Sequence, residues 1–170
     1  TNLFTSSDGT NWSHDQTLVA DGGGDSQHEP ICIFKRSDER FIVFIKDGHS
    51  SEDRHLHAIL SETADPTGNW EVVEGAIINN DGSTEQVYHF NVIQIEDVFY
   101  GLCPLYNSTS EQIYQVDLYE SRNGLEWTLV KEALFSVGSS GAWDDEMFLG
   151  THFIEISNAW NLYYAGSPEG

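Results

Sequence analysis

The chain has 170 residues, 39% of them hydrophobic and 12% aromatic, which is typical of one folded domain with a sizeable core. Its 28 Asp and Glu against 7 Lys and Arg give a net charge of −21, which argues against nucleic acid or an anionic membrane surface as a partner. The longest apolar run, 41–45, is far shorter than the roughly 18 residues that a membrane-spanning helix needs.

Short segments rich in Val, Ile, Phe and Tyr follow one another along the chain, separated by Gly, Asn and Asp, and all are typical of β-strands. In chain order the predicted strands are 2–5, 31–34, 41–45, 55–60, 90–95, 98–102, 114–119, 153–156 and 160–165. Segment 55–62 also fits a helix, but its counterparts later in the chain are strand-like, so a strand is predicted there too. The expected fold class is all-β.

Three turn motifs divide these strands into repeats: Ser6 to Trp12, Ser61 to Trp70 and Ser121 to Trp127, with the tryptophans 58 and 57 residues apart. In Ser-x-Asp-Gly the Asp side chain caps the turn and Gly supplies a positive φ. Each period holds four strands, which predicts a blade of a β-propeller. The predicted organisation is one propeller domain, 1–170, with repeats at about 13–70, 71–127, and 128–170 plus 1–12.

The two ends of the chain are predicted to be complementary halves of one split blade. The N-terminus begins with the strand that precedes a Ser-x-Asp-Gly turn, and the C-terminus ends one strand before such a turn. Three blades are too few to close a ring, and an open arc would expose strand edges. Two solutions are open: a closed six-bladed homodimer, favoured because the length is close to three periods, or a part of a longer propeller.

The order of Ser-x-Asp-Gly-x-x-Trp, a Pro-bearing strand and a Tyr-Tyr-x-Gly strand resembles the five-bladed propeller glycosidases of the arabinanase/xylosidase and invertase-like families. The segments that match are Ser6 to Trp12, Glu29-Pro30, Trp143-Asp144 and Tyr163 to Gly166. The resemblance implies a carboxylate pair in a central pocket, with the general acid just before a Pro at the start of an inner strand. Glu29 resembles that acid, and Asp144, Asp145 and Glu146 lie at the corresponding entrance of the third repeat.

The sequence also departs from that pattern. The entrance of the second repeat, 85–89, has no obvious catalytic Asp, and a third clearly placed carboxylate is not visible. Five blades cannot be built from whole copies of a three-repeat chain, so loss of catalysis is an open alternative. Glycoside cleavage needs one protonated and one ionised carboxyl, about 5–5.5 Å apart for retention and about 6.5–9.5 Å for inversion. Glu29 with Asp144 or Glu146 could form such a pair, or these could be ordinary solvated acids.

Alignment of the inner strands places Cys32, Asn91 and His152 at one position, and Pro30, His89 and Gly150 at another. If these positions face the channel, His89, Asn91 and His152 line a polar pocket suited to sugar hydroxyls. Hydrogen bonding within the wall of the sheet is the other interpretation.

No cofactor is expected to be required, and no metal ligands are predicted. Ca²⁺ near the acidic entrance is left as an option. Cys32 and Cys103 lie in apolar strands, which predicts free, buried thiols.

Three functions remain open: a glycoside hydrolase, which is favoured, a non-catalytic lectin-like propeller, or a scaffold that binds only protein. A sialidase is disfavoured because the turn spacing differs and because the four arginines, Arg36, Arg40, Arg54 and Arg122, lie near turns or charged segments. The expected partners are a carbohydrate ligand and a second copy of the chain. A soluble protein is expected, with an extracellular or periplasmic location favoured.

Overall fold

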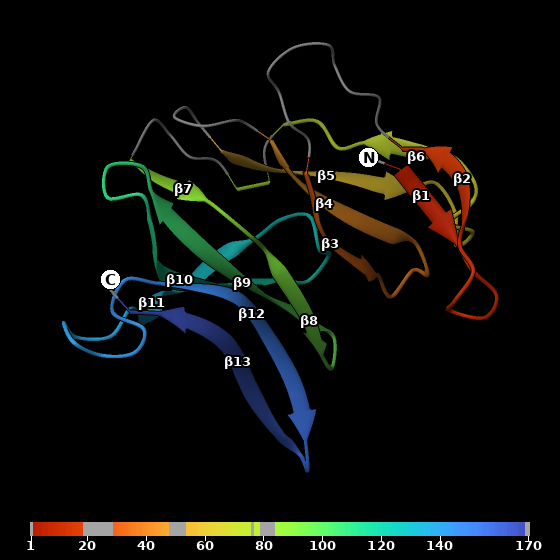
Figure 1. Cartoon of the computed structure of the whole chain (residues 1–170). Coiled ribbons are helices and arrows are strands. Elements are labelled where there is room, and N and C mark those ends of the chain that lie inside the picture. The colour runs from red at the N-terminus through yellow and green to blue at the C-terminus, as the bar shows by residue number, and fades with distance from the viewer. Residues whose placement is uncertain (1, 19–28, 48–53, 76, 79–83, 169–170) are drawn as a thin grey trace.

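The computed structural model describes residues 2–18, 29–47, 54–75, 77–78 and 84–168, and every regular element in them is a β-strand (Figure 1). The all-β prediction is confirmed, including a strand at 55–61, where the sequence also fitted a helix. None of the described residues forms a helix long and apolar enough to span a membrane. In chain order the strands are β1 (Asn2–Thr5), β2 (Ser13–Thr17), β3 (Glu29–Lys35), β4 (Phe41–Asp47), β5 (His55–Ser61), β6 (Trp70–Val72), β7 (Glu85–Val87), β8 (Asn91–Ile95), β9 (Val98–Asn107), β10 (Gln112–Ser121), β11 (Thr128–Ser136), β12 (Met147–Ile156) and β13 (Ala159–Ser167).

The strands form four antiparallel sheets, each made of strands that are close in sequence. The first sheet has the order β3-β4-β5-β6. In the second sheet, β11-β10-β9 continues to both β7 and β8, which pair with different ends of β9. Counted as one interrupted strand, β7 and β8 give the second sheet the same four-strand meander as the first. The third sheet is the hairpin β12-β13, and the N-terminal hairpin is β1-β2.

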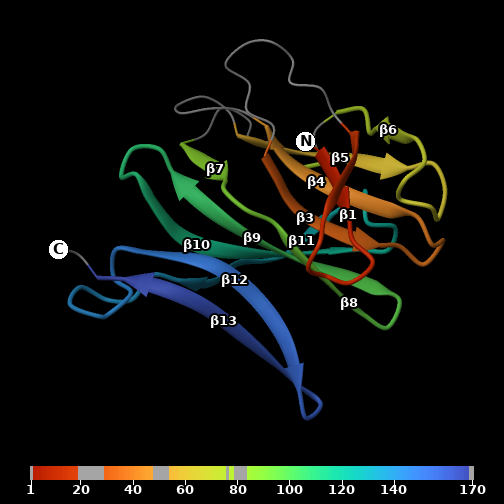
Figure 2. The same cartoon turned by 45° about the vertical axis from the view of Figure 1, so that its right-hand side comes forward.

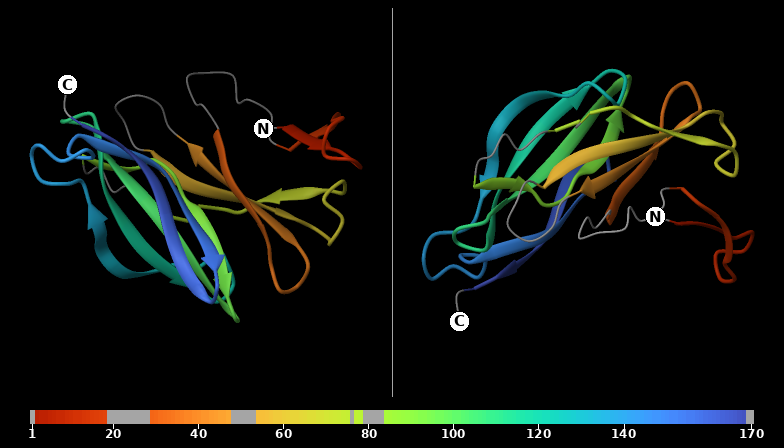
Figure 3. Two further views of the ribbon diagram at one scale, coloured as in Figure 1. Left: turned by 60° about the horizontal axis from the view of Figure 1, so that its bottom comes forward. Right: turned by 90° about the horizontal axis from the view of Figure 1, so that it is seen from above.

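The sheets stand side by side in a row (Figure 2). Figure 3 shows the N-terminal hairpin beside the first sheet, on the side away from the second and third sheets. Among the inner strands, β8 of the second sheet contacts both β3 of the first and β12 of the third. The starts of these inner strands therefore bring together residues that are distant in the sequence.

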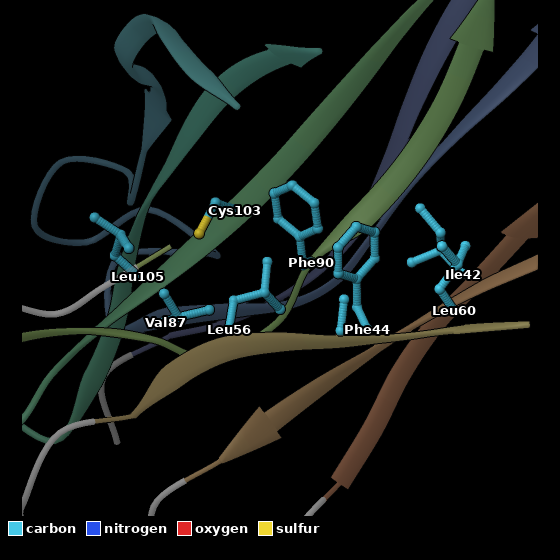
Figure 4. Packing of buried hydrophobic residues seen from close by; sticks show 9 residues of the cluster. Ile42, Phe44, Leu56, Leu60, Val87, Phe90, Cys103 and Leu105 are labelled. Atoms are coloured by element: carbon cyan, nitrogen blue, oxygen red, sulfur yellow. The ribbon is translucent and has the colours of Figure 1, made fainter. Parts of the chain in front are cut away.

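A core cluster fills the space between the first and second sheets (Figure 4). The ring of Phe90 lies edge-on to Phe44, with centroids 5.0 Å apart, and edge-on to Trp127 at 4.9 Å. Such aromatic pairs contribute about 0.5–1.5 kcal/mol each beyond the area that they bury. A second cluster, with Leu102 and Phe148 at its centre, joins the second and third sheets. Burial between successive sheets therefore holds the row together.

The innermost strand is interrupted in each of the three sheets. β3 shifts register between Pro30 and Cys32, and β12 does so between Leu149 and His152. In the second sheet the chain leaves the ladder between β7 and β8. A β-bulge of this kind changes the direction of nearby side chains, and bulges are frequent beside functional sites.

Strand register gives Cys32, Asn91 and His152 matching positions next to these interruptions. The residues opposite them on the second strand of each sheet are Phe44, Leu102 and Tyr163, respectively. Both cysteines are free, as predicted, but only Cys103 is fully buried, because Cys32 lies at the half-covered edge of the core.

The turns after β1 and β10 share one hydrogen-bond pattern. The hydroxyl oxygen of Ser6 accepts the backbone N–H of Gly9 at 2.9 Å, and that of Ser121 accepts the N–H of Gly124 at 2.8 Å. In each turn a second side chain, Asp8 in the first and Asn123 in the second, accepts two further backbone N–H groups. Both glycines have a positive φ, +72° and +75°, which glycine adopts without strain.

The tryptophans that follow these turns differ in burial. Trp70 and Trp127 each donate an indole N–H to a backbone carbonyl at 3.0 Å and pack back on four-stranded sheets. Trp12, in the two-stranded N-terminal hairpin, is 62% exposed. Among the described residues β1 pairs with β2 and not with β13, so the predicted halves of the split blade lie apart in the single chain.

Candidate functional site

Glu29 is the first residue of β3, the inner strand of the first sheet. Its cross-strand partner is Lys46 of β4, and the Lys46 Nζ lies 2.7 Å from the Glu29 Oε2. The Glu29 side chain is half-exposed, whereas Lys46 is buried. A buried ammonium group is costly unless it is paired, and Glu29 provides that pairing. The ion pair therefore fixes the Glu29 carboxylate at the start of β3.

Two cations flank the ring of Tyr88, which follows β7. Lys46 Nζ lies 4.7 Å from the centre of the Tyr88 ring, and the Arg54 guanidinium lies 5.9 Å from it. Arg54 also covers the ring of Tyr106 at 4.4 Å, and its Nη1 donates a hydrogen bond to the Gln86 side chain at 2.8 Å. These cation–π contacts fix both cations at the starts of the inner strands. The sequence had suggested only that Arg54 lies near a charged segment.

His89 lies in the interruption between β7 and β8, next to these groups. Burial lowers its pKa, the charges of His152 and Lys46 lower it further, and Glu29 acts in the opposite direction. These couplings place Glu29, Lys46, His89 and His152 in one electrostatic neighbourhood. The Nδ1 of His89 is buried, and no described residue offers it a hydrogen-bond partner. We call Glu29, Lys46, Arg54, Tyr88, His89 and His152 the mouth cluster.

Asn91 begins β8 and links the second sheet to the third. Its Nδ2 donates hydrogen bonds to the backbone oxygen of Thr151 and, at 3.4 Å, to the Thr151 hydroxyl. Thr151 is fully buried. Of the three predicted sugar-binding residues, Asn91 is therefore the one engaged in the wall between sheets, while His89 and His152 belong to the mouth cluster.

The acids 144–146 lie on the loop before β12 and have structural contacts. The Tyr164 hydroxyl donates to the buried Asp144 carboxylate at 2.7 Å, and this hydrogen bond raises the pKa of Tyr164. Asp145 accepts the backbone N–H of Gly141. Glu146 accepts a hydrogen bond from the Ser167 hydroxyl at 3.4 Å. These contacts hold the loop on β13 of the third sheet, and the second sheet's inner strand lies between this sheet and Glu29.

Strand register also shows which residue of the third sheet corresponds to Glu29. Glu29 is opposite Lys46, two residues beyond Phe44, and the matching pair in the third sheet is Leu149 opposite Ala165. An apolar residue therefore holds the position equivalent to Glu29, and the 144–146 acids precede it on the loop.

Sequence reasoning missed Lys46, Arg54 and Tyr88. One available signal was Lys46 itself, a charged residue directly after the apolar run 41–45 in a chain with few cations. Among the described residues, no three His, Cys, Asp or Glu side chains are grouped so as to hold a metal ion.

A cavity of about 370 Å³ lies beside the site, between the N-terminal hairpin and the first sheet. Its lining is mostly apolar and includes Leu3, Pro30, Ile33 and Val43. None of the residues that line this cavity belongs to the mouth cluster. The apolar lining suits packing against another sheet better than binding of a polar ligand.

Neither a protein-family profile nor a curated protein matches the sequence. Solved structures do match the fold. The Bombyx mori GH32 β-fructofuranosidase BmSUC1 has a TM-score of 0.71 at 13% identity, over 99% of this chain and 35% of that one. A structure described as a glycoside hydrolase has a TM-score of 0.67 at 13% identity, over 92% and 49%. An N-acetylgalactosamine deacetylase from F. plautii, in complex with blood group B trisaccharide, has a TM-score of 0.62 at 17% identity, over 88% and 43%.

These likenesses establish a glycosidase-like fold. The chain spans less than half the length of each of these three structures.

Proposed function

We propose that this chain belongs to a carbohydrate-active propeller of the glycoside hydrolase type, with its ligand at the starts of the inner strands. The observation that carries the proposal is the mouth cluster, in which the Glu29–Lys46 ion pair lies against Tyr88 and the next residue, His89, has a buried Nδ1 without a described hydrogen-bond partner. The glycosidase-like fold supports it. Glu29 is the proposed catalytic carboxylate, and His89 and His152 are the proposed contacts of sugar hydroxyls. The 144–146 acids, which are bonded within the third sheet and its loop, are kept as the candidates for the second carboxyl.

The test is the variant Glu29→Gln, assayed against a panel of nitrophenyl glycosides and natural oligosaccharides. We expect kcat/KM to fall by about 10²- to 10⁴-fold, the usual contribution of one acid–base group, while the melting temperature changes little because Glu29 is half-exposed. The matched control is Glu74→Gln, an exposed acid after β6. Wild-type turnover by Glu29→Gln would remove Glu29 from the mechanism.

A binding-only propeller is the second candidate, and one observation favours it. The register position equivalent to Glu29 in the third sheet holds Leu149, so a second carboxylate is not present at that place. Sugar binding without turnover, retained in Glu29→Gln, would identify this function.

We further propose that the sheets are blades and that a second copy closes the ring. The outer face of the third sheet carries Leu149, Ile154, Ile156 and Tyr163, which are 46–50% exposed. At the other end of the row, the first sheet presents the apolar cavity beside Ile33 and Val43. Each of these two faces is suited to packing against a neighbouring sheet. In a dimer the third sheet of one copy would cover the first-sheet end of its partner, and the reverse.

In this assembly β13 of one chain pairs with β1 of its partner, as β9 pairs with β10 within the second sheet. The shared blade then has the order β12-β13-β1-β2, and each ring has six blades. Further blades of a longer chain would be the alternative occupant of the same faces.

A further inference from the structure

The chain has only seven Lys and Arg, and their distribution is uneven. Lys35, Arg36 and Arg40 form ion pairs around the β3-β4 turn, and Arg122 pairs with an acid at another turn. Lys131 is exposed on β11. The remaining two, Lys46 and Arg54, both lie on Tyr88 at the starts of the inner strands.

The cationic pair is built into the site rather than spread on the surface. Lys46 is 8% exposed, and the Arg54 guanidinium lies 4.4 Å from the centre of the Tyr106 ring and 5.9 Å from that of Tyr88. Glu29 balances Lys46, whereas the described hydrogen-bond acceptor of Arg54 is the neutral amide of Gln86, which is itself 2% exposed. Among the described contacts, the cluster therefore carries two cationic side chains and one ion-paired carboxylate.

The charge of Lys46 and Arg54 is opposite in sign to the net charge of the whole chain. A net charge of −21 repels anions at long range, but salt screens this field within about 8 Å at physiological ionic strength. Inside that distance the local charges decide which ligand group is favoured, and Lys46, Glu29 and Arg54 together carry one net positive charge. A guanidinium group offers a planar fork of donors that matches a carboxylate, and an ammonium group adds a point charge.

We propose that the mouth cluster selects a carbohydrate that carries a carboxylate, that is, a uronic acid unit, with Arg54 and Lys46 as the specificity-determining residues. The proposal rests on the carbohydrate-active function proposed above and names its substrate class. The carboxylate accepts hydrogen bonds from Arg54 and Lys46, and the unpartnered Nδ1 of His89 is available to a neighbouring sugar hydroxyl.

The test measures binding of matched pairs of probes by calorimetry on the full chain. The probes are trimers of galacturonate and of glucuronate, each beside its methyl-esterified form, which has the same sugars without the charge; a sulfated neutral trimer separates carboxylate from other anions. The variants are Lys46→Met and Arg54→Gln. The controls are Lys131→Met and Arg122→Gln, which remove the same charge from exposed sites.

We expect the wild type to bind one acidic trimer at least tenfold more tightly than its ester. Each mouth variant should weaken the acidic trimer by about ten- to a hundredfold, the usual range for a charge-assisted hydrogen bond, and weaken the ester by a smaller factor, so that the preference for the acid is lost. The controls should keep the wild-type preference. Circular dichroism melting identifies any variant that fails to fold, and Arg54→Lys then replaces Arg54→Gln.

Other results overturn the inference. Equal or tighter binding of the esters would refute acidic selectivity while leaving the carbohydrate-active function standing. Preference for the sulfated trimer would replace the carboxylate with another anion. Binding of none of the probes, together with no binding of neutral oligosaccharides, would count against both the inference and the proposed function.

Discussion

The His89 imidazole is half-buried in the interruption between β7 and β8. Burial, His152 and Lys46 lower its pKa in the folded chain, and Glu29 offsets part of this effect. In the unfolded chain a His has a pKa of about 6.5. Between the lowered value and about 6.5, the unfolded chain binds more protons, so the free energy of unfolding rises with pH.

We therefore expect stability to be lost as the pH falls from about 6.5 through the folded pKa of His89. In the variant His89→Gln this loss should be smaller. Urea unfolding at pH 5 and 7.5 measures the difference, with His14→Gln, an exposed histidine of the N-terminal hairpin, as the control. Equal losses in the wild type and His89→Gln would show that His89 is not held neutral by its surroundings.

At the scale of elements, the contact between the first and second sheets depends on Gly101 in β9. A Cβ atom at this position would lie 2.2 Å from the ring of Phe90 and 3.0 Å from that of Trp127. Phe90 cannot turn aside freely, because its ring also packs edge-on against Phe44. β9 thus approaches the aromatic core more closely than any side chain larger than hydrogen permits.

The variant Gly101→Ala should lower the free energy of unfolding by about 1–3 kcal/mol, the usual cost of overpacking a core. Chemical denaturation monitored by tryptophan fluorescence measures it. The double variant with Phe90→Leu tests the cause, because a smaller side chain at 90 should recover part of the loss as a favourable coupling energy. If the effects of the two substitutions on the free energy of unfolding simply add, Phe90 is not the side chain that requires glycine at position 101.

At the scale of the whole molecule, the row of sheets leaves apolar surface at both ends. Of the large apolar side chains that are exposed, Ile154, Ile156 and Tyr163 share the outer face of the third sheet. A monomeric protein rarely leaves such a face open to water. Among the described strands β13 pairs only with β12, so its other edge offers a row of backbone donors and acceptors on which another strand could pair.

Light scattering in moderate salt should give a dimer, at twice 19.1 kDa, in which the two chains complete each other's blade. The variant Ile154→Lys should convert it to a folded monomer, because Ile154 is 49% exposed and its replacement leaves the single chain intact. The control is Val130→Lys on β11, with the same exposure but outside the proposed contact. A wild-type monomer would exclude the dimer and favour further blades as the covering partner.

Much of the fold could be predicted from local patterns. Strand positions follow from alternation and β-branched composition, and the Ser6 and Ser121 turns follow from side-chain capping and glycine at positive φ. These are short-range effects, set by residues within a few positions of one another. The matching register of Cys32, Asn91 and His152 also depends on local strand pairing.

The candidate site was predictable only in part. Glu29 was predicted from its residue type and the following Pro and stays a prediction. Its partner Lys46 and the neighbouring Arg54 come from other parts of the first sheet and meet at Tyr88 through packing between two sheets. The sequence by itself determined the strands, the turns and the excess of acids. Only the tertiary structure decided that Lys46 and Arg54 gather where the inner strands begin, and that Tyr164 donates a hydrogen bond to Asp144. The reason is that such contacts depend on how buried faces pack rather than on spacing along the chain.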